Sequence, residues 1–102
     1  MNKYHAKKTT VDGITFDSKK EANRYCELLL LEKGNAINHL RLQPKWDCVV
    51  NGTKICTYKA DFEYVDVERG FTVEDTKGFR TPVYKLKKKL VEALYGIEIL
   101  ET

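Results

Sequence analysis

One short stretch near residue 75 combines a carboxylate and an amine at a spacing suited to catalysis. The segment 73–78 contains Asp75 and Lys77, separated by a single residue. In a β-strand, residues two apart point to the same face of the sheet, so Asp75 and Lys77 project together and Thr76 points the opposite way. The motif Asp-x-Lys is therefore a geometric unit, although by itself it is also typical of a surface ion pair.

A second acidic position, Asp61, precedes this motif on the neighbouring strand. A three-residue loop at 68–70, with its glycine left-handed, would pair Glu63 with Asp75. The same register pairs Asp61 with Lys77, so all four side chains would share one face. A four-residue loop would turn Asp61 to the other face, because a one-residue slip inverts every side chain. The candidate site therefore depends on this register.

Converging carboxylates of this kind predict a bound cation. Without one they repel each other, whereas Mg²⁺ prefers oxygen ligands and keeps several waters. Asp61 and Asp75 are the expected ligands, with Mg²⁺ as the cofactor and Mn²⁺ as a substitute. Lys77 would hold or deprotonate the attacking water while the metal stabilises charge on phosphate oxygens. This combination predicts phosphodiester hydrolysis, and a solvated acidic surface is the alternative.

Longer stretches of the sequence resemble a known family. Asp61 and the run Asp75-Thr76-Lys77, preceded by a predicted helix that carries Glu21, resemble the PD-(D/E)XK nuclease superfamily. The proline that often precedes the first strand acid there is absent, since Lys59-Ala60 come before Asp61. Four segments are similar to small phage and prophage endonucleases that resemble Holliday junction resolvases: 3–8, 12–21, 42–44 and 74–78.

The resemblance implies a restriction-endonuclease-like core and specific roles for the acidic residues. Asp61 and Asp75 would bind the metal together with Thr76, and Lys77 would serve the attacking water. Glu21 would complete the acidic, catalytic set from the first helix and bind the metal as well. Glu21 also has a structural interpretation, because segment 18–21 fits a capping box, and both interpretations stay open.

Basic residues around these motifs are expected to contact the phosphate backbone of DNA. The net charge of +3 names no partner, but segment 77–89 holds six cations and no acid. Phosphate contacts dominate affinity for nucleic acids and carry no sequence information, which favours recognition of DNA shape. The expected contacts are Lys7, Lys8, Lys19, Lys20, Gln43, Arg80, Tyr84, Lys85 and Lys88.

The elements that must position these residues are expected to form one nuclease domain, residues 1–102, of the α/β class with a mixed sheet. A flexible basic arm at 1–8 precedes a short hairpin at 9–16. The helices are expected at 18–33 and from Pro82 to Gly96, where apolar residues at 83, 86, 90, 91 and 94 keep helical spacing. Strands are expected at 39–50, 53–67, 71–77 and 97–101, which gives the order α-β-β-β-α-β after the hairpin.

Several classes of protein are disfavoured by composition. The chain has no apolar run of 18 residues and no signal-peptide pattern at its start, so a cytoplasmic protein without a membrane partner is expected. Three cysteines without C-x-x-C spacing argue against a zinc site and a disulfide framework. A two-residue turn at Asn51-Gly52 places Cys48 opposite Ile55 and turns Cys56 to the other face, so these thiols are expected to stay reduced.

The resulting hypothesis is a Mg²⁺-dependent endonuclease that acts on branched DNA, leaves a 5′-phosphate and uses no small-molecule cofactor. A four-way junction needs two symmetric incisions and one small domain holds one site, so a two-fold homodimer is expected. Two alternatives stay open. One is another structure- or sequence-selective nuclease, and the other is a catalytically inactive DNA-binding module with the same fold.

Overall fold

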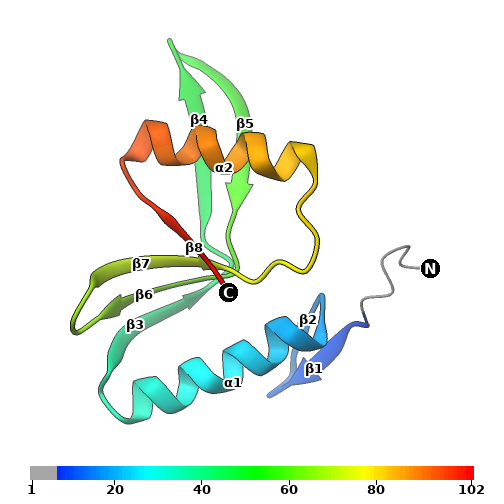
Figure 1. The fold of residues 1–102 in the computed structure, drawn as a ribbon, viewed down its shortest axis with the longest axis vertical. Helices are drawn as coiled ribbons and strands as arrows, with labels where there is room; N and C mark the ends of the chain where they lie inside the picture. The colour runs from blue at the N-terminus through cyan, green and yellow to red at the C-terminus, as the bar shows by residue number, and fades with distance from the viewer. Residues whose placement is uncertain (1–6) are drawn as a thin grey trace.

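A four-stranded sheet lies between two helices in the computed structural model, which describes residues 7–102 (Figure 1). The predicted arm at 1–8 lies outside the described residues except for Lys7 and Lys8, which are exposed. The elements are β1 (Thr9–Val11), β2 (Ile14–Phe16), α1 (Lys19–Lys33), β3 (Ile37–Leu42), β4 (Lys45–Val50), β5 (Thr53–Lys59), β6 (Phe62–Asp66), β7 (Gly70–Asp75), α2 (Pro82–Tyr95) and β8 (Ile99–Glu101).

The main sheet has the strand order β3-β6-β7-β8 and is mixed, as expected. The pairs β3–β6 and β6–β7 are antiparallel, and β8 runs parallel to β7. Helix α1 lies along one side of this sheet, whereas α2 and the two-stranded ribbon β4–β5 lie on the other (Figure 1). Within residues 7–102, no helix has the length and apolar character needed to cross a membrane.

Two of the predicted strands are each divided in two. The chain leaves the sheet at Gln43-Pro44, where Gln43 has a φ of 53° and Pro44 lacks an N–H for pairing. It returns at Ala60-Asp61, and the N–H of Ala60 donates to the Pro44 carbonyl at 3.0 Å. The segment between these two breaks forms the ribbon β4–β5, so the continuous strands expected at 39–50 and 53–67 are wrong.

Both helices begin and end close to the predicted residues. The Ser18 side chain accepts the N–H of Glu21 at the start of α1, and the Thr81 side chain accepts that of Tyr84 before α2. Gly96 ends α2 with a φ of 65°, the left-handed conformation typical of a helix C-cap. The apolar stripe of α2 is less buried than expected, because Val91 is buried whereas Leu86 is 69% exposed.

Apolar cores lie on both faces of the sheet because successive residues of a strand point to opposite sides. Aromatic residues of β6 face α1, and residues of β7 and β8 face α2. The buried core on the α1 side comprises Phe16, Ala22, Tyr25, Leu28, Ile37, Phe62 and Tyr64. The core on the α2 side comprises Cys48, Tyr58, Ala60, Val73, Val91 and Ile99. Strand β7 is thus covered on both faces.

The β6–β7 hairpin differs from the predicted register by two residues. Asp66 pairs with Gly70 and Glu63 pairs with Val73, so the loop is 67–69. The Asp66 carboxylate ends β6 early by accepting the N–H groups of Glu68 and Arg69, at 2.8 and 3.0 Å. A shift of two residues preserves which face each side chain occupies, because the side-chain period is two. Asp61 consequently lies beside Asp75 instead of Lys77.

The β4–β5 ribbon also has a register that the sequence did not indicate. Its turn is Asn51-Gly52, with φ values of 50° and 78°, as expected for a two-residue hairpin. A bulge between Cys48 and Val49 then shifts the pairing, so that Cys48 lies opposite Cys56. The expectation that these two thiols occupy opposite faces is therefore wrong.

Candidate active site

Asp75 is the most deeply buried residue of the predicted catalytic set. It ends β7, and its side chain has no exposed surface. Its Oδ2 accepts a hydrogen bond from the Tyr58 hydroxyl, whereas its Oδ1 is buried without a hydrogen-bond partner. Burial is the main cause that raises the pKa of Asp75 to about 6. A buried oxygen left without a donor is a suitable ligand for a cation.

Asp61 lies next to Asp75, in the break between β5 and β6. Its backbone N–H donates to the Glu74 carbonyl at 3.1 Å, and its Oδ2 accepts the N–H of Thr76 at 2.7 Å. Burial raises the pKa of Asp61, and the bond from Thr76 opposes this effect in part. The structure thus brings the two aspartates together at the end of β7.

Lys77 places its ammonium between a carboxylate and an aromatic ring. Its Nζ is 3.8 Å from Oδ1 of Asp75 and 4.9 Å from the centre of the Tyr84 ring. The cation–π contact with Tyr84 holds the lysine side chain toward α2. The side chain keeps 29% of its surface exposed, so a water or a phosphate can reach the ammonium group.

Glu21 joins the group from the first turn of α1. Its side chain is buried, and its pKa is raised to about 7, first by burial and then by the charges of Asp61 and Asp17. The backbone N–H of Glu21 bonds to the Ser18 side chain, as the capping box predicts. Its carboxylate makes no hydrogen bond with any residue in 7–102, so the second half of the capping box is not formed there. This favours a role for Glu21 in the acidic site.

Thr76 is less suited to bind a metal through its side chain. Its hydroxyl shares a 2.9 Å hydrogen bond with the Thr102 hydroxyl, and its N–H is donated to Asp61. Both of these Thr76 groups are thus engaged within the protein.

The donor chemistry of the site fits a hard divalent cation. In the described part of the chain, no three His, Cys, Asp or Glu side chains are grouped closely enough to form a ready metal site. Asp61 and the free Oδ1 of Asp75 nevertheless supply the carboxylate oxygens that Mg²⁺ binds, and Mg²⁺ completes its coordination with waters. The fit rests on Oδ1 of Asp75, which accepts no hydrogen bond within residues 7–102 and has the Lys77 ammonium 3.8 Å away.

Glu63 does not belong to this site, although the predicted register paired it with Asp75. It lies opposite Val73, and its carboxylate is 3.6 Å from the Arg41 guanidinium. The early end of β6 at Asp66 is the reason, because it moves the whole pairing by two residues.

Two residues that sequence reasoning missed support the site. Tyr58 holds Oδ2 of Asp75 from the ribbon, and Glu101 pairs with Asp75 across β7 and β8. The Tyr84 hydroxyl and Arg80 both bond to the Glu101 carboxylate and lower its pKa. The alternation of the ribbon signalled that Tyr58 is buried, but no sequence signal gave its partner or the parallel register of β8.

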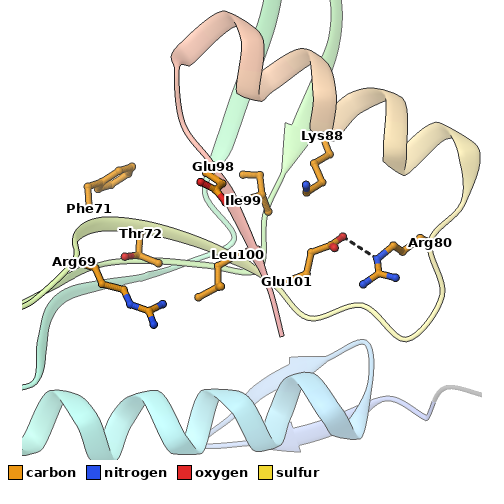
Figure 2. Close-up of a pocket in the computed structure, with 9 residues that line it drawn as sticks. All are labelled: Arg69, Phe71, Thr72, Arg80, Lys88, Glu98, Ile99, Leu100 and Glu101. Carbon is orange, nitrogen blue, oxygen red and sulfur yellow. Dashed lines mark hydrogen bonds and ion pairs between the residues drawn. The ribbon is translucent and has the colours of Figure 1, made fainter.

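Several predicted DNA contacts gather along α2 beside the active site. Two shallow grooves, of about 220 and 570 Å³, adjoin Glu101 and the start of α2. Figure 2 shows Arg80 turned toward Glu101 and Lys88 pointing from α2 into the larger groove. Lys85 and Tyr84 line the smaller groove, so four of the predicted contacts border one surface.

The other predicted contacts are less closely grouped. Lys20 lies beside the site, since its Nζ donates to the Lys77 carbonyl at 3.4 Å. Gln43 is exposed, and its N–H donates to the Asp61 carbonyl at 2.9 Å, which places it at the edge of the site. Lys7, Lys8 and Lys19 are exposed, and within residues 7–102 they make no hydrogen bond or ion pair with a residue of the site.

Comparison with known proteins gives a family for the chain. No curated protein matches it, and no solved structure does. A family model described as "Protein of unknown function (DUF1064)" matches residues 1–99. This match covers nearly the whole sequence, and the chain therefore belongs to the DUF1064 family.

Proposed function

We propose that this protein is a Mg²⁺-dependent endonuclease that hydrolyses phosphodiester bonds in branched DNA, in the manner of a Holliday junction resolvase. The observation that carries the proposal is the buried Oδ1 of Asp75, which accepts no hydrogen bond within residues 7–102 and lies 3.8 Å from the Lys77 ammonium. Asp61, whose Oδ2 accepts the N–H of Thr76, lies beside the same end of β7. A carboxylate pair beside a partly exposed amine is a donor set suited to metal-assisted hydrolysis.

The residues of the site have separate roles in this proposal. Asp61 and Asp75 hold the cation, and the Thr76 carbonyl is a further ligand. Lys77 orients the attacking water and takes part in its deprotonation. A bound Mg²⁺ would supply stabilisation of negative charge on the phosphate oxygens. Glu21, whose pKa of about 7 allows it to accept a proton near neutral pH, completes the acidic set.

The arrangement of the elements supports the proposal. Leaving aside the ribbon β4–β5, the order is α1, β3, β6, β7, α2, β8, which agrees with the restriction-endonuclease-like core implied by the resemblance to PD-(D/E)XK nucleases. The two candidate metal ligands lie where β6 begins and β7 ends, in the sheet that both helices cover.

The basic surface along α2 supports DNA as the substrate. Arg80, Lys85 and Lys88 border grooves next to Glu101, which is itself the partner of Asp75 in the sheet. Contacts of this kind bind phosphates without reading bases. Two incisions on a junction require two such sites, so the proposed active form is a two-fold homodimer.

Incubation with labelled DNA tests the proposal. The purified protein is given a synthetic four-way junction, a matched duplex or a single strand, with Mg²⁺ or with EDTA. We expect cleavage of the junction only with Mg²⁺ and no cleavage by Asp75→Asn. Glu63→Gln, which removes a neighbouring carboxylate outside the site, is the matched control and should cleave normally. If the folded wild-type protein cuts none of the three DNAs, the nuclease proposal is overturned, and equal cutting of the duplex would overturn the specificity for branches.

A further inference from the structure

Cys48 and Cys56 lie directly opposite each other on the ribbon β4–β5. The bulge after Cys48 produces this pairing, since without it Cys48 would face Ile55. Residues paired in this way share one face of the ribbon, here the face that packs against α2. Burial raises the pKa of the Cys48 thiol, and its contact with the Cys56 thiol raises it further.

The spacing of such a pair suits a disulfide. The Cα atoms of directly opposed residues in antiparallel strands are about 4.5–5.5 Å apart. A disulfide accepts Cα separations of about 4.4–6.8 Å, so the backbone needs little movement. The Cβ atoms of a disulfide are closer than those of most cross-strand pairs, and a bond formed under that mild strain is more readily reduced.

One of the two thiols is accessible to an oxidant. Cys48 is completely buried, whereas Cys56 is partly exposed and lines a groove of about 210 Å³ between β5 and α2. Apolar side chains, including Leu86 and Val83, form most of the rest of this groove. The third cysteine, Cys26, is exposed on α1 on the other side of the sheet.

We propose that Cys48 and Cys56 are a reversible redox pair that forms a cross-strand disulfide with glutathione disulfide as the oxidant. The Cys56 thiolate attacks glutathione disulfide, forms a mixed disulfide and releases one glutathione thiolate. Cys48 then loses its proton as its sulfur attacks the Cys56 sulfur and displaces the second glutathione thiolate. The two protons lost by the cysteines are taken up by the two glutathione thiolates. Two cysteines are thus oxidised while one glutathione disulfide is reduced to two glutathiones.

Tyr58 lies near this cysteine pair on β5 and also contacts the candidate active site. Tyr58 is two residues after Cys56 on β5 and points to the same face, and its hydroxyl donates a hydrogen bond to Asp75. The redox proposal stands on the register of the ribbon and does not depend on nuclease activity.

Mass spectrometry of the folded protein tests the proposal. Cys26→Ser, which removes the exposed third thiol, is incubated with glutathione disulfide and then analysed by intact mass and by peptide mapping without reduction. We expect a product two hydrogens lighter, a peptide pair joining residues 48 and 56, and full reversal by dithiothreitol. Circular dichroism confirms that the protein stays folded.

The outcomes separate the redox pair from ordinary thiol chemistry. In Cys26→Ser/Cys56→Ser, the remaining buried Cys48 should stay unmodified under the same conditions. A stable glutathione adduct on Cys56 with a free Cys48 would overturn the proposal. Recovery of two unmodified thiols, or of disulfides only between chains, would overturn it as well.

Discussion

Glu74 and Asp75 are consecutive residues of β7, and both side chains are completely buried on opposite faces of the sheet. Glu74 faces α1, where Arg24 donates two hydrogen bonds to its carboxylate, at 2.8 and 2.7 Å, and Tyr64 donates another. Asp75 receives one hydrogen bond, from Tyr58, and its other oxygen receives none.

The difference separates a structural carboxylate from a candidate functional one. A buried charge is tolerated when an opposite charge and hydrogen bonds compensate it fully. Glu74 meets that condition, and its hydrogen bonds with Arg24, together with its charge, raise the pKa of Arg24 above the ordinary range. Asp75 meets it only in part, because Lys77 is 3.8 Å from Oδ1 and donates no hydrogen bond to it, and burial outweighs this partner and raises the pKa of Asp75 to about 6. An external cation would supply the missing compensation for Asp75 only.

The largest expected effect comes from removing the compensation of Glu74. Arg24→Ala leaves the Glu74 carboxylate buried without a cation, and we expect the free energy of unfolding to fall by about 3–5 kcal/mol. Urea denaturation measures this change. Arg41→Ala is the matched control, because Arg41 is exposed and pairs with a carboxylate on the same sheet. A loss for Arg24→Ala no greater than for this control would contradict the structural role of Glu74.

The second-largest effect is expected on DNA cleavage when a residue of the candidate active site is replaced. Asp61→Ala, Asp75→Ala and Lys77→Ala should each reduce junction cleavage by about a hundredfold or more, the scale seen when one group that stabilises a transition state is lost. Binding of the junction should change little, because it depends on lysines elsewhere. Single-turnover cleavage and gel-shift titration separate the two quantities. Full activity in any of these variants would remove that residue from the catalytic set.

Thermal melting with Mg²⁺ or Mn²⁺ tests whether Asp75, unlike Glu74, binds a cation. A cation that binds only the folded state stabilises it by about 2.7 kcal/mol at a concentration one hundred times its dissociation constant. We therefore expect the melting temperature to rise with either ion and the rise to disappear in Asp75→Asn. The same ions should still stabilise Glu63→Gln. No rise in the wild-type protein up to millimolar ion would argue against a metal at Asp75.

The sequence predicted the local elements well and the long-range register poorly. Caps and turns such as Ser18 and Asn51-Gly52 act through neighbouring residues, so their residue types are sufficient to place them. The register of β6 and β7 depends on Asp66 binding loop amides, and the pairing of Cys48 with Cys56 depends on a bulge. Those features arise from competition between alternative pairings, which residue types alone do not decide.

The candidate site was predictable to the same extent. Asp75 and Lys77 are two residues apart, so their common face follows from strand geometry. The compensation of Glu74 by Arg24 joins residues 50 positions apart and could not be read from spacing. The difference in environment between Glu74 and Asp75 therefore could be seen only in the tertiary structure.

The stability of the metal-free protein should depend on pH. The folded-state pKa values of Asp75 and Glu21, about 6 and about 7, lie above their ordinary values of 3.8 and 4.5. The folded state then binds protons more tightly than the unfolded state. The stability that these two groups contribute is fully present below their ordinary pKa values and is lost as the pH rises through about 6 and about 7.

Melting in EDTA between pH 5 and pH 8 measures this dependence. We expect a loss on the order of 1–2 kcal/mol across the range, since one pKa unit corresponds to about 1.4 kcal/mol and partial exposure screens the charges. Asp75→Asn should reduce the dependence and leave the part that is due to Glu21, whereas Glu63→Gln should leave the profile unchanged. A wild-type protein that gains stability as the pH rises would contradict the uncompensated state of Asp75.

The smallest expected effect concerns two lysines of α2, one with and one without an ion pair inside the protein. Lys88 is 3.4 Å from Glu92, whereas Lys85 is exposed and has no ion pair within residues 7–102. A cation without an internal partner is free to replace the counterions of a phosphate, so Lys85→Ala should reduce the slope of log affinity against log salt by about one. Lys88→Ala should reduce it less, because binding DNA must first break the pair with Glu92. Equilibrium binding to the junction at several salt concentrations measures both slopes.

An unchanged slope in Lys85→Ala would show that Lys85 on α2 does not contact the DNA phosphates. Equal reductions in the two variants would show that the ion pair between Lys88 and Glu92 does not limit the contact of Lys88 with DNA.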